Sequence, residues 1–130
     1  MRIGELAARS GVSVRSVRYY EEQGLLSSTR SASGQRHYTD HEVERVAFIQ
    51  RLYAGGLSSR TILELLPCAD APSERNSDVA LERMAQERDR LSAHIADLVR
   101  TRAALDGLIV TAREYRDQLR TAGAGAPVAC

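Results

Sequence analysis

The sequence predicts a mostly α-helical protein in which a winged helix-turn-helix unit precedes a long C-terminal helix. Three observations lead to this fold class. Two short amphipathic segments meet at a glycine near the N-terminus, a turn-rich segment with arginines follows, and residues 78–120 contain no proline. Hydrophobic residues make up 43% of the 130 residues and aromatic residues 5%, so we expect a folded chain with an aliphatic core.

Charge and composition narrow the function classes. The net charge is only +1, but residues 1–38 hold six arginines against three acidic residues, an excess that favours contact with nucleic acid. No run of about 18 apolar residues and no signal-peptide stretch is present, so we expect a cytoplasmic protein without a membrane partner. Cys68 and Cys130 lack a CxxC spacing and the histidines are scattered, so we expect neither a metal site nor a cofactor.

The first two helices form a helix-turn-helix pattern. Residues 3–10 form the first helix, a glycine ends it, and Ser13 caps the second. In the second helix, Arg15, Arg18 and Tyr19 share one face, separate from the apolar one. Arginine is the side chain that most often reads guanine in the major groove, so this face is a candidate for DNA recognition. A solvated face whose arginines pair with neighbouring glutamates is an equally good interpretation of these residues alone.

A β-hairpin is expected next, with strands at 27–30 and 36–39 and Gly34 in the turn between them. This hairpin would carry Arg30, Arg36, His37 and Tyr38, and the cations and hydroxyl groups of such a wing contact phosphates. A plain connecting loop is the alternative.

Two further helices complete the N-terminal unit. Thr39 and Glu42 stand in capping-box spacing at the start of a helix over 40–54. A shorter helix starts after Ser58 and stops at a proline. Arg60 lies in its first turn, where backbone amides attract a phosphate, and is a candidate for a second contact with the DNA backbone. An ordinary surface arginine is the alternative.

The C-terminal half has a different character. We expect a DNA-binding domain over residues 1–70, a linker over 71–77, a dimerisation helix over 78–120 and a flexible tail over 121–130. Apolar residues in the long helix recur in steps of four and three, the heptad pattern of a coiled coil. The residues expected to pair two chains are Met84, Leu91, Ile95, Leu98, Leu105 and Ile109. Such a seam needs a partner, which we infer to be a second copy; a hairpin folded back at Gly107 is the alternative.

Four segments resemble the MerR family of bacterial transcription regulators: IGELAARSGVS, VRYYEEQGLL, GQRHYTDHEVERV and GLSSRTILELL. The resemblance spans the predicted DNA-binding domain and continues less specifically through the long helix. It implies a winged helix-turn-helix with two extra helices, then an antiparallel coiled coil that makes a homodimer. The residues that match the family's DNA-contacting positions are Arg15, Arg18, Tyr19, Arg36, Tyr38 and Arg60.

The resemblance also implies a mechanism. Dimers of this family bind an inverted repeat inside a promoter whose spacer is too long for RNA polymerase, and with signal they bend and untwist that DNA. We therefore expect promoter DNA, a second copy of the chain and RNA polymerase as partners. Such a deformation costs on the order of 1–6 kcal/mol, which several phosphate contacts per subunit must offset.

The signal expected for this chain differs from the signals of the best-known branches of the family. Metal-sensing and iron–sulfur relatives carry cysteines just after the dimer helix, whereas LIVTAREYRDQLR contains none. Drug-sensing relatives often append a large effector domain, which we do not expect here. The remaining signals are a small organic effector, a thiol-reactive or oxidative signal at Cys68, or none at all. A buried structural thiol is the alternative for Cys68.

Two other function classes compete with a regulator. An excisionase-like accessory protein of recombination shares the winged helix-turn-helix, but the long seam from Met84 onward favours the regulator. Enzyme chemistry would need a nucleophile and a base that the sequence does not bring together, so we expect no catalytic site.

Overall fold

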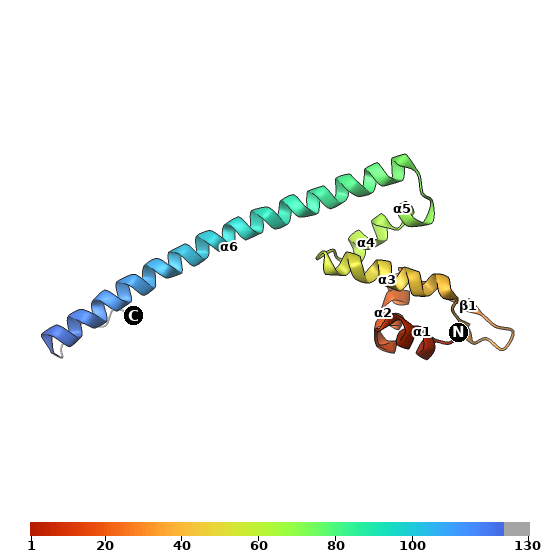
Figure 1. The fold of residues 1–130 in the computed structure, drawn as a ribbon, viewed down its shortest axis with the longest axis horizontal. Helices are drawn as coiled ribbons and strands as arrows, with labels where there is room; N and C mark the ends of the chain where they lie inside the picture. Colours follow the sequence, from red (N-terminus) through yellow and green to blue (C-terminus); the bar gives the residue numbers. More distant parts are fainter. Residues whose placement is uncertain (124–130) are drawn as a thin grey trace. The chain divides into compact units, whose positions relative to one another are not determined.

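The computed structural model describes residues 1–123, and the chain divides into two units, Met1–Arg83 and Met84–Cys130 (Figure 1). The elements in chain order are α1 (Ile3–Ser10), α2 (Val14–Glu22), β1 (Thr29–Arg30), β2 (Arg36–His37), α3 (Asp40–Ala54), α4 (Ser59–Leu65), α5 (Pro67–Asp70) and α6 (Glu74–Ala122). The predicted fold class, mostly helical with a small wing and a long C-terminal helix, is confirmed.

The helix-turn-helix consists of α1 and α2. Gly11 ends α1 with a positive φ of 70°, a conformation that glycine adopts without steric cost. The Ser13 hydroxyl then accepts a hydrogen bond of 3.0 Å from the N–H of Ser16, which caps α2. Leu6 from α1 and Val17 from α2 are fully buried, so the two helices pack through their apolar faces as predicted.

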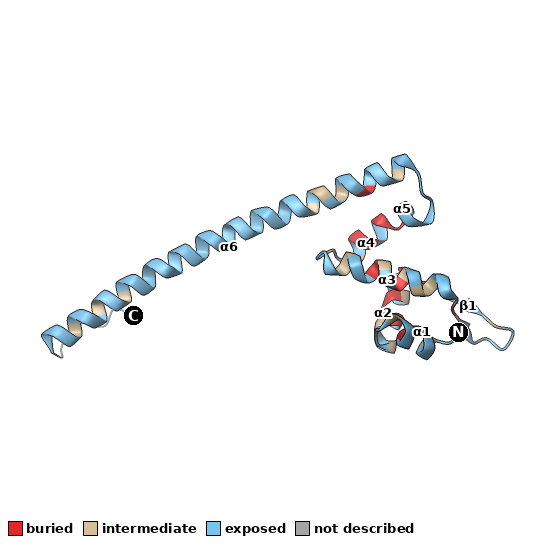
Figure 2. Ribbon diagram, viewed as in Figure 1, coloured by how far each residue is buried: buried red, intermediate tan, exposed pale blue. Residues whose placement is uncertain are grey.

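The core of the first unit lies among α1 to α4, and Figure 2 shows its buried residues on these helices. Aliphatic side chains dominate it, and the rings of Tyr20 and Tyr53 stack with centroids 5.8 Å apart. The buried residues of this cluster are Leu6, Ala7, Val17, Tyr20, Leu25, Leu26, Tyr38, Val46, Ile49, Ile62 and Leu66. Each large apolar side chain buried here contributes about 1.5–3 kcal/mol, so the unit holds its own hydrophobic core.

The wing is an antiparallel pair in which Thr29 faces His37 and Arg30 faces Arg36. Gly34 occupies the turn with a φ of 82°, as the sequence predicts. The strands are shorter than expected, because the chain leaves the hairpin after His37 and Tyr38 turns into the core.

The junction between α4 and α6 differs from the predicted linker. Pro67 starts the short helix α5, a position where its missing N–H has no cost. The hydroxyl of Ser73 accepts a 3.0 Å hydrogen bond from the N–H of Asn76, and α6 begins at Glu74. The prediction of a linker over 71–77 is therefore wrong for its last part, which is helical.

The first unit also extends past the predicted boundary at residue 70. Ala80 on α6 is buried. Nε of Arg83 lies 2.9 Å from a carboxylate oxygen of Glu64, and its Nη2 lies 3.3 Å from Oγ1 of Thr61. These contacts attach the beginning of α6 to α4.

Helix α6 runs without a break through Gly107 to Ala122, and almost all of its residues are exposed (Figure 2). The alternative of a hairpin folded back at Gly107 is therefore wrong. Thr121 and Ala122 of the predicted tail belong to the helix, and Cys130 lies outside the described residues. Within residues 1–123, no helix has the length and apolar character needed to cross a membrane.

Candidate nucleic-acid interface

The candidate recognition face lies on the exposed side of α2. Val17 and Tyr20 anchor this helix in the core, which leaves Arg15 and Arg18 exposed and Tyr19 44% exposed. The shared exposed face predicted for these residues is confirmed. Their contact with DNA stays a prediction.

A shallow pocket beside α2 gathers arginines from three separate segments: the N-terminus, α2 and the wing. The residues lining it are Arg2, Ile3, Arg18, Arg30, Gly34, Gln35 and Arg36. The Arg30 guanidinium donates a 2.9 Å hydrogen bond to the carbonyl of Gly34, which holds it against the wing. Guanidinium groups bind phosphate oxygens with paired N–H donors, so this arginine pocket suits a DNA backbone.

The sequence analysis missed the contribution of Arg2 to the pocket, whereas Arg30 lies on the wing as predicted. The amino group of Met1 donates to the carbonyl of Tyr38 at 2.7 Å, and the N–H of Tyr38 donates to the carbonyl of Met1 at 2.8 Å. This pairing of distant segments brings Arg2 beside the wing. No local pattern in the sequence indicates it.

Tyr38 does not lie on the surface of the wing. Its side chain is only 1% exposed, and its hydroxyl donates a hydrogen bond to a carboxylate oxygen of Glu21. Burial, reinforced by this bond, raises the pKa of Tyr38 to about 12, so the hydroxyl is protonated at neutral pH. The predicted contact between Tyr38 and phosphate is therefore wrong, because the strand ends before residue 38 and the ring fills the core.

Glu21 connects α2 to the wing through this buried hydroxyl and through Arg36. Its second carboxylate oxygen lies 3.1 Å from Nη1 of Arg36. The Glu21 side chain is 13% exposed and that of Arg36 is 43% exposed, so the carboxylate forms the inner half of the pair. Arg36 and Arg18 also line a second small pocket with Glu21. Glu21 thus holds the wing residue Arg36 next to α2.

Ser59 connects α2 with α3 and α4. Its hydroxyl lies 3.2 Å from the hydroxyl of Tyr19, and it also hydrogen-bonds the hydroxyl of Tyr53. Arg60 is the next residue of α4. It is exposed and does not line the arginine pocket. The structure therefore places Arg60 on the helix tied to Tyr19, and its DNA contact stays a prediction.

The predicted pairing residues on α6 are exposed in the single chain. Their exposed fractions range from 37% for Met84 to 55% for Leu105. The set comprises Met84, Leu91, Ile95, Leu98, Leu105 and Ile109. Leu81 on the same helix is also exposed and extends the heptad stripe by one position, which the sequence analysis missed.

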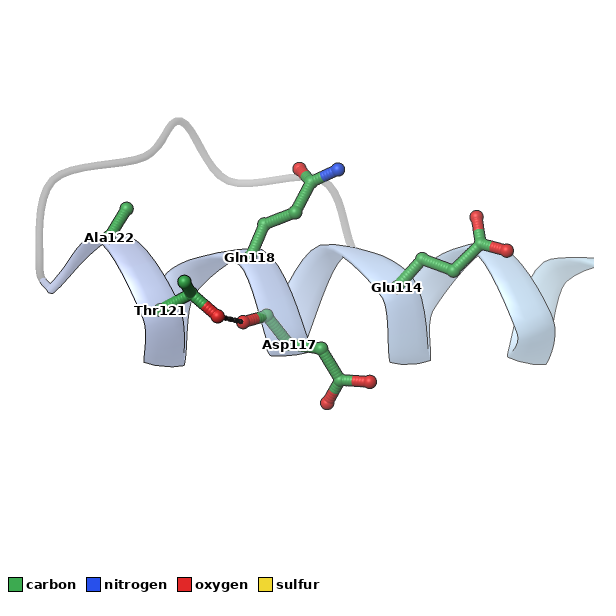
Figure 3. Close-up of a pocket in the computed structure, with 5 residues that line it drawn as sticks. All are labelled: Glu114, Asp117, Gln118, Thr121 and Ala122. Atoms are coloured by element: carbon green, nitrogen blue, oxygen red, sulfur yellow. Dashed lines mark hydrogen bonds between the residues drawn. The ribbon is translucent and has the colours of Figure 1, made fainter.

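Evidence for a signal site is sparse in the described part of the chain. Cys68 carries a free thiol of intermediate exposure on α5. No group of three or more potential metal ligands occurs within residues 1–123. A pocket near the end of α6 is lined by Glu114, Asp117, Gln118, Thr121 and Ala122, all from successive turns of one helix (Figure 3). The Thr121 hydroxyl donates back to the Asp117 carbonyl of the preceding turn at 2.9 Å, so its proton is used within the helix.

Two family models match the chain. The model described as MerR HTH family regulatory protein matches residues 1–67, and the one described as MerR, DNA binding matches residues 43–108. Together they span α1 to α5 and much of α6.

Relatives and solved structures agree with these matches. The HTH-type transcriptional regulator HmrR of Sinorhizobium medicae is 44% identical over 105 residues, which cover 78% of this chain and 71% of the relative. Heavy metal-dependent transcription regulator 2 of Rhizobium meliloti is 40% identical over 111 residues, covering 82% and 75%. The lead(II) complex of the transcription regulator PbrR691 from Ralstonia metallidurans has 32% identity and a TM-score of 0.58, covering 99% and 92%.

A further solved structure shares the fold. HiNmlR, a MerR family regulator lacking the sensor domain and bound to promoter DNA, has 23% identity and a TM-score of 0.55, covering 95% of this chain and 94% of its own. The helix-turn-helix and the wing lie within the residues that the first family model matches, and the second model extends into the long helix. The chain belongs to the MerR family of DNA-binding transcriptional regulators.

Proposed function

We propose that two copies of this chain bind a promoter palindrome and switch transcription by distorting the DNA. The observation that carries this proposal is the arginine pocket beside the exposed face of α2. A helix presenting Arg15 and Arg18 fits the major groove, where guanidinium groups read guanine. The arginine pocket next to it supplies phosphate contacts, which add affinity and a steep dependence on salt.

The seam on α6 supports the second copy. A single helix that leaves leucines and isoleucines exposed along one heptad stripe gains stability by pairing. A parallel pair in register would set Arg88, Arg102 and Arg116 each against the same arginine of the second copy in the seam. An antiparallel pair instead sets each of these arginines across from the other, mostly apolar, heptad position. Charge repulsion therefore favours the antiparallel homodimer.

Distortion of the promoter is the switching step of the proposal. The recognition helix, the wing arginine and Arg60 lie on different elements of one unit, and internal hydrogen bonds connect those elements. A rigid unit of this kind can impose its own shape on a duplex. The elastic cost of on the order of 1–6 kcal/mol is offset by contacts that only the bent DNA allows. RNA polymerase at the same promoter, in the cytoplasm, would then read the change.

The signal remains part of the proposal, with three chemical classes. A thiol-reactive compound could modify Cys68, whose partial exposure allows access. A small organic effector is the second class. A metal ion is the third, because relatives carry names such as heavy metal-dependent transcription regulator. Each class would change the affinity or the shape of the DNA complex.

Removing one recognition arginine tests the DNA-binding part of the proposal. Arg18→Ala should weaken binding to a selected operator by about 1–3 kcal/mol and leave the unfolding temperature close to that of the parent chain. Arg90→Ala removes the same charge from α6 and should leave operator binding near the parental value. Operator affinity measured by fluorescence anisotropy at fixed salt checks both. Equal affinities for Arg18→Ala and the parent would overturn the assigned face.

The signal classes are separated by the same binding assay. Operator affinity and bend angle are measured with a thiol oxidant and with divalent metal ions, in the parent chain and in Cys68→Ser. A response to oxidant that Cys68→Ser abolishes supports the thiol class. A response to metal retained by Cys68→Ser supports a metal site elsewhere, and no response to either leaves an organic effector or no signal.

A further inference from the structure

The exposed seam of α6 carries charges that select one alignment of the two helices. One heptad position holds Leu81, Arg88, Ile95, Arg102, Ile109 and Arg116, and the other holds Met84, Leu91, Leu98, Leu105 and Ala112. The first alternates apolar residues with arginine, while the second is apolar throughout. Because the two positions differ in this way, the seam contains information about register as well as about pairing.

We propose that the two α6 helices pair antiparallel in the register in which Ile95 faces Leu98 of the second copy, held there by an ion pair between Arg88 and Asp106 of the second copy. This inference rests on the proposed homodimer and specifies its contacts. The layers across the seam are then Ile95 with Leu98, Leu91 with Arg102, Arg88 with Leu105, Met84 with Ile109, and Leu81 with Ala112. The two-fold axis passes between residues 96 and 97.

Apolar burial alone does not choose this register. Shifting one helix by a heptad in either direction again sets each residue of one position across from a residue of the other. Leu81 and Ile95 find an apolar partner in each of the three alignments, whereas Leu91 faces Arg102 in the proposed register and an isoleucine in the two shifted ones. The choice therefore falls to the charged residues that flank the seam.

The charged residues of the flanking position next to the arginines are Asp78, Asp106, Arg113 and Arg120. In an antiparallel pair, this flank of one helix faces the same flank of the second copy across the seam. In the proposed register Arg88 lies beside Asp106 of the second copy. By the same spacing Arg113 lies opposite Asp78 of the second copy. Asp78, Asp106 and Arg113 then each have an opposite charge as a neighbour.

The two shifted registers lose these pairs. A shift in one direction sets Asp78 opposite Arg120 but places Arg88 beside Arg113 of the second copy. A shift in the other direction sets Asp106 opposite Asp78. Like charges across an interface are unfavourable, and they suppress wrong alignments. In the single chain Arg88 forms an ion pair with its neighbour Asp89, at 3.4 Å and with both side chains 74% exposed. Its guanidinium is therefore accessible to a carboxylate of a second copy.

Charge reversal at residue 88 or at residue 106 distinguishes the three registers, because the direction of the change in the dimer dissociation constant differs among them. In the proposed register, Arg88→Glu and Asp106→Arg should each weaken the homodimer about tenfold, since each creates two like-charge contacts per dimer. Mixing the two variants should restore the parental dissociation constant, because the heterodimer contains only opposite charges at these contacts. Arg90→Glu lies outside the seam and serves as the matched control, which Asp106→Arg should not rescue.

The measurements are sedimentation equilibrium of the full-length chains and co-purification of differently tagged copies. A tighter Arg88→Glu homodimer would indicate the register that sets residue 88 beside Arg113, and would overturn the proposal. A tighter Asp106→Arg homodimer would indicate the opposite shift and would also overturn it. These results leave the dimer itself intact, whereas a monomeric parent chain would contradict the proposed function instead.

Discussion

The N-terminal unit and helix α6 differ in how far their apolar residues are buried. The first unit encloses Leu6, Val17, Ile49 and Ile62 in a core contributed by its own helices. Along α6, leucines and isoleucines of the same kind stay exposed in the single chain. The first region buries its apolar residues by itself, and in the proposed homodimer a second chain covers those of α6.

This difference explains how the chain separates recognition from pairing. Recognition requires side chains held in fixed positions, and the closed core supplies them through Glu21, Arg36 and Tyr38. Pairing requires an apolar surface that is exposed in the single chain, and the seam of α6 is the surface that we propose for it. Substitutions should therefore act differently in the two regions, and four predictions follow from the largest effect to the smallest.

A charge in the seam should break the dimer. Leu98→Glu sets two carboxylates near the proposed two-fold axis, so the dimer dissociation constant should rise by at least about 100-fold. Ala93→Glu, on the side of α6 away from the seam, adds the same charge and should change little. Sedimentation velocity checks both variants, while circular dichroism of the first unit should stay close to the parental spectrum. A dimeric Leu98→Glu would show that the seam is not the interface.

A cavity in the core should weaken the first unit whatever the state of the dimer. Ile62 is fully buried, so Ile62→Ala should lower the free energy of unfolding by about 2–5 kcal/mol. Urea unfolding at several protein concentrations checks the contrast, because the loss should be the same at each. Ile109→Ala in a Leu98→Glu background is the control, and it should cost little. A loss for Ile62→Ala that vanished on dilution would contradict the separation.

The buried hydroxyl should contribute less than the core. Tyr38→Phe keeps the ring and removes the bond to Glu21, which should cost about 0.5–1.5 kcal/mol and loosen Arg36. The pKa of Tyr38 is raised to about 12, so its contribution is present below its ordinary pKa of about 10 and is lost as pH rises through 12. Unfolding measured from pH 8 to 12 should show the parent losing stability relative to Tyr38→Phe. A constant difference would argue against the buried phenol.

Removing the capping carboxylate of α3 should have the smallest effect on the free energy of unfolding. A carboxylate oxygen of Glu42 accepts hydrogen bonds of 2.6 Å from the N–H and the hydroxyl of Thr39. Burial alone would raise the pKa of Glu42, but the hydrogen bonds from Thr39 outweigh it and lower the pKa below the ordinary value. Glu42→Gln should therefore cost less than about 1 kcal/mol at pH 7.

The pH dependence identifies that contribution. A lowered pKa gives stability that is present above the unfolded value, about 4.3, and disappears as pH falls through the folded value. The difference between Glu42→Gln and the parent should shrink in acid, as measured by thermal unfolding from pH 7 to 3. Glu44→Gln on the exposed side of α3 is the control. A difference that persisted in acid would assign the effect to something other than the carboxylate.

Local signals explain what the sequence could predict. Gly11, Ser13 and Thr39 mark the ends of α1, α2 and α3, and the structure has those helices at the predicted positions. The heptad spacing on α6 likewise predicts a long helix with one apolar stripe, because periodicity depends only on neighbouring turns.

Contacts between distant segments explain what it could not predict. Tyr38 is buried because it pairs with Met1 and bonds to Glu21, and neither partner is near it in sequence. Arg2 joins the arginine pocket for the same reason. The early start of α6 depends on the Ser73 hydroxyl, whose capping role competes with several other polar residues in that segment.

The molar mass of the protein on its DNA tests the central claim most directly. Multi-angle light scattering of the full chain with a selected palindromic duplex should give two chains per duplex, and the chain without DNA should have twice its 14.3 kDa mass at micromolar concentration. A chain that stays monomeric without DNA, and binds one copy per duplex with no preference for symmetric sites, would contradict the account.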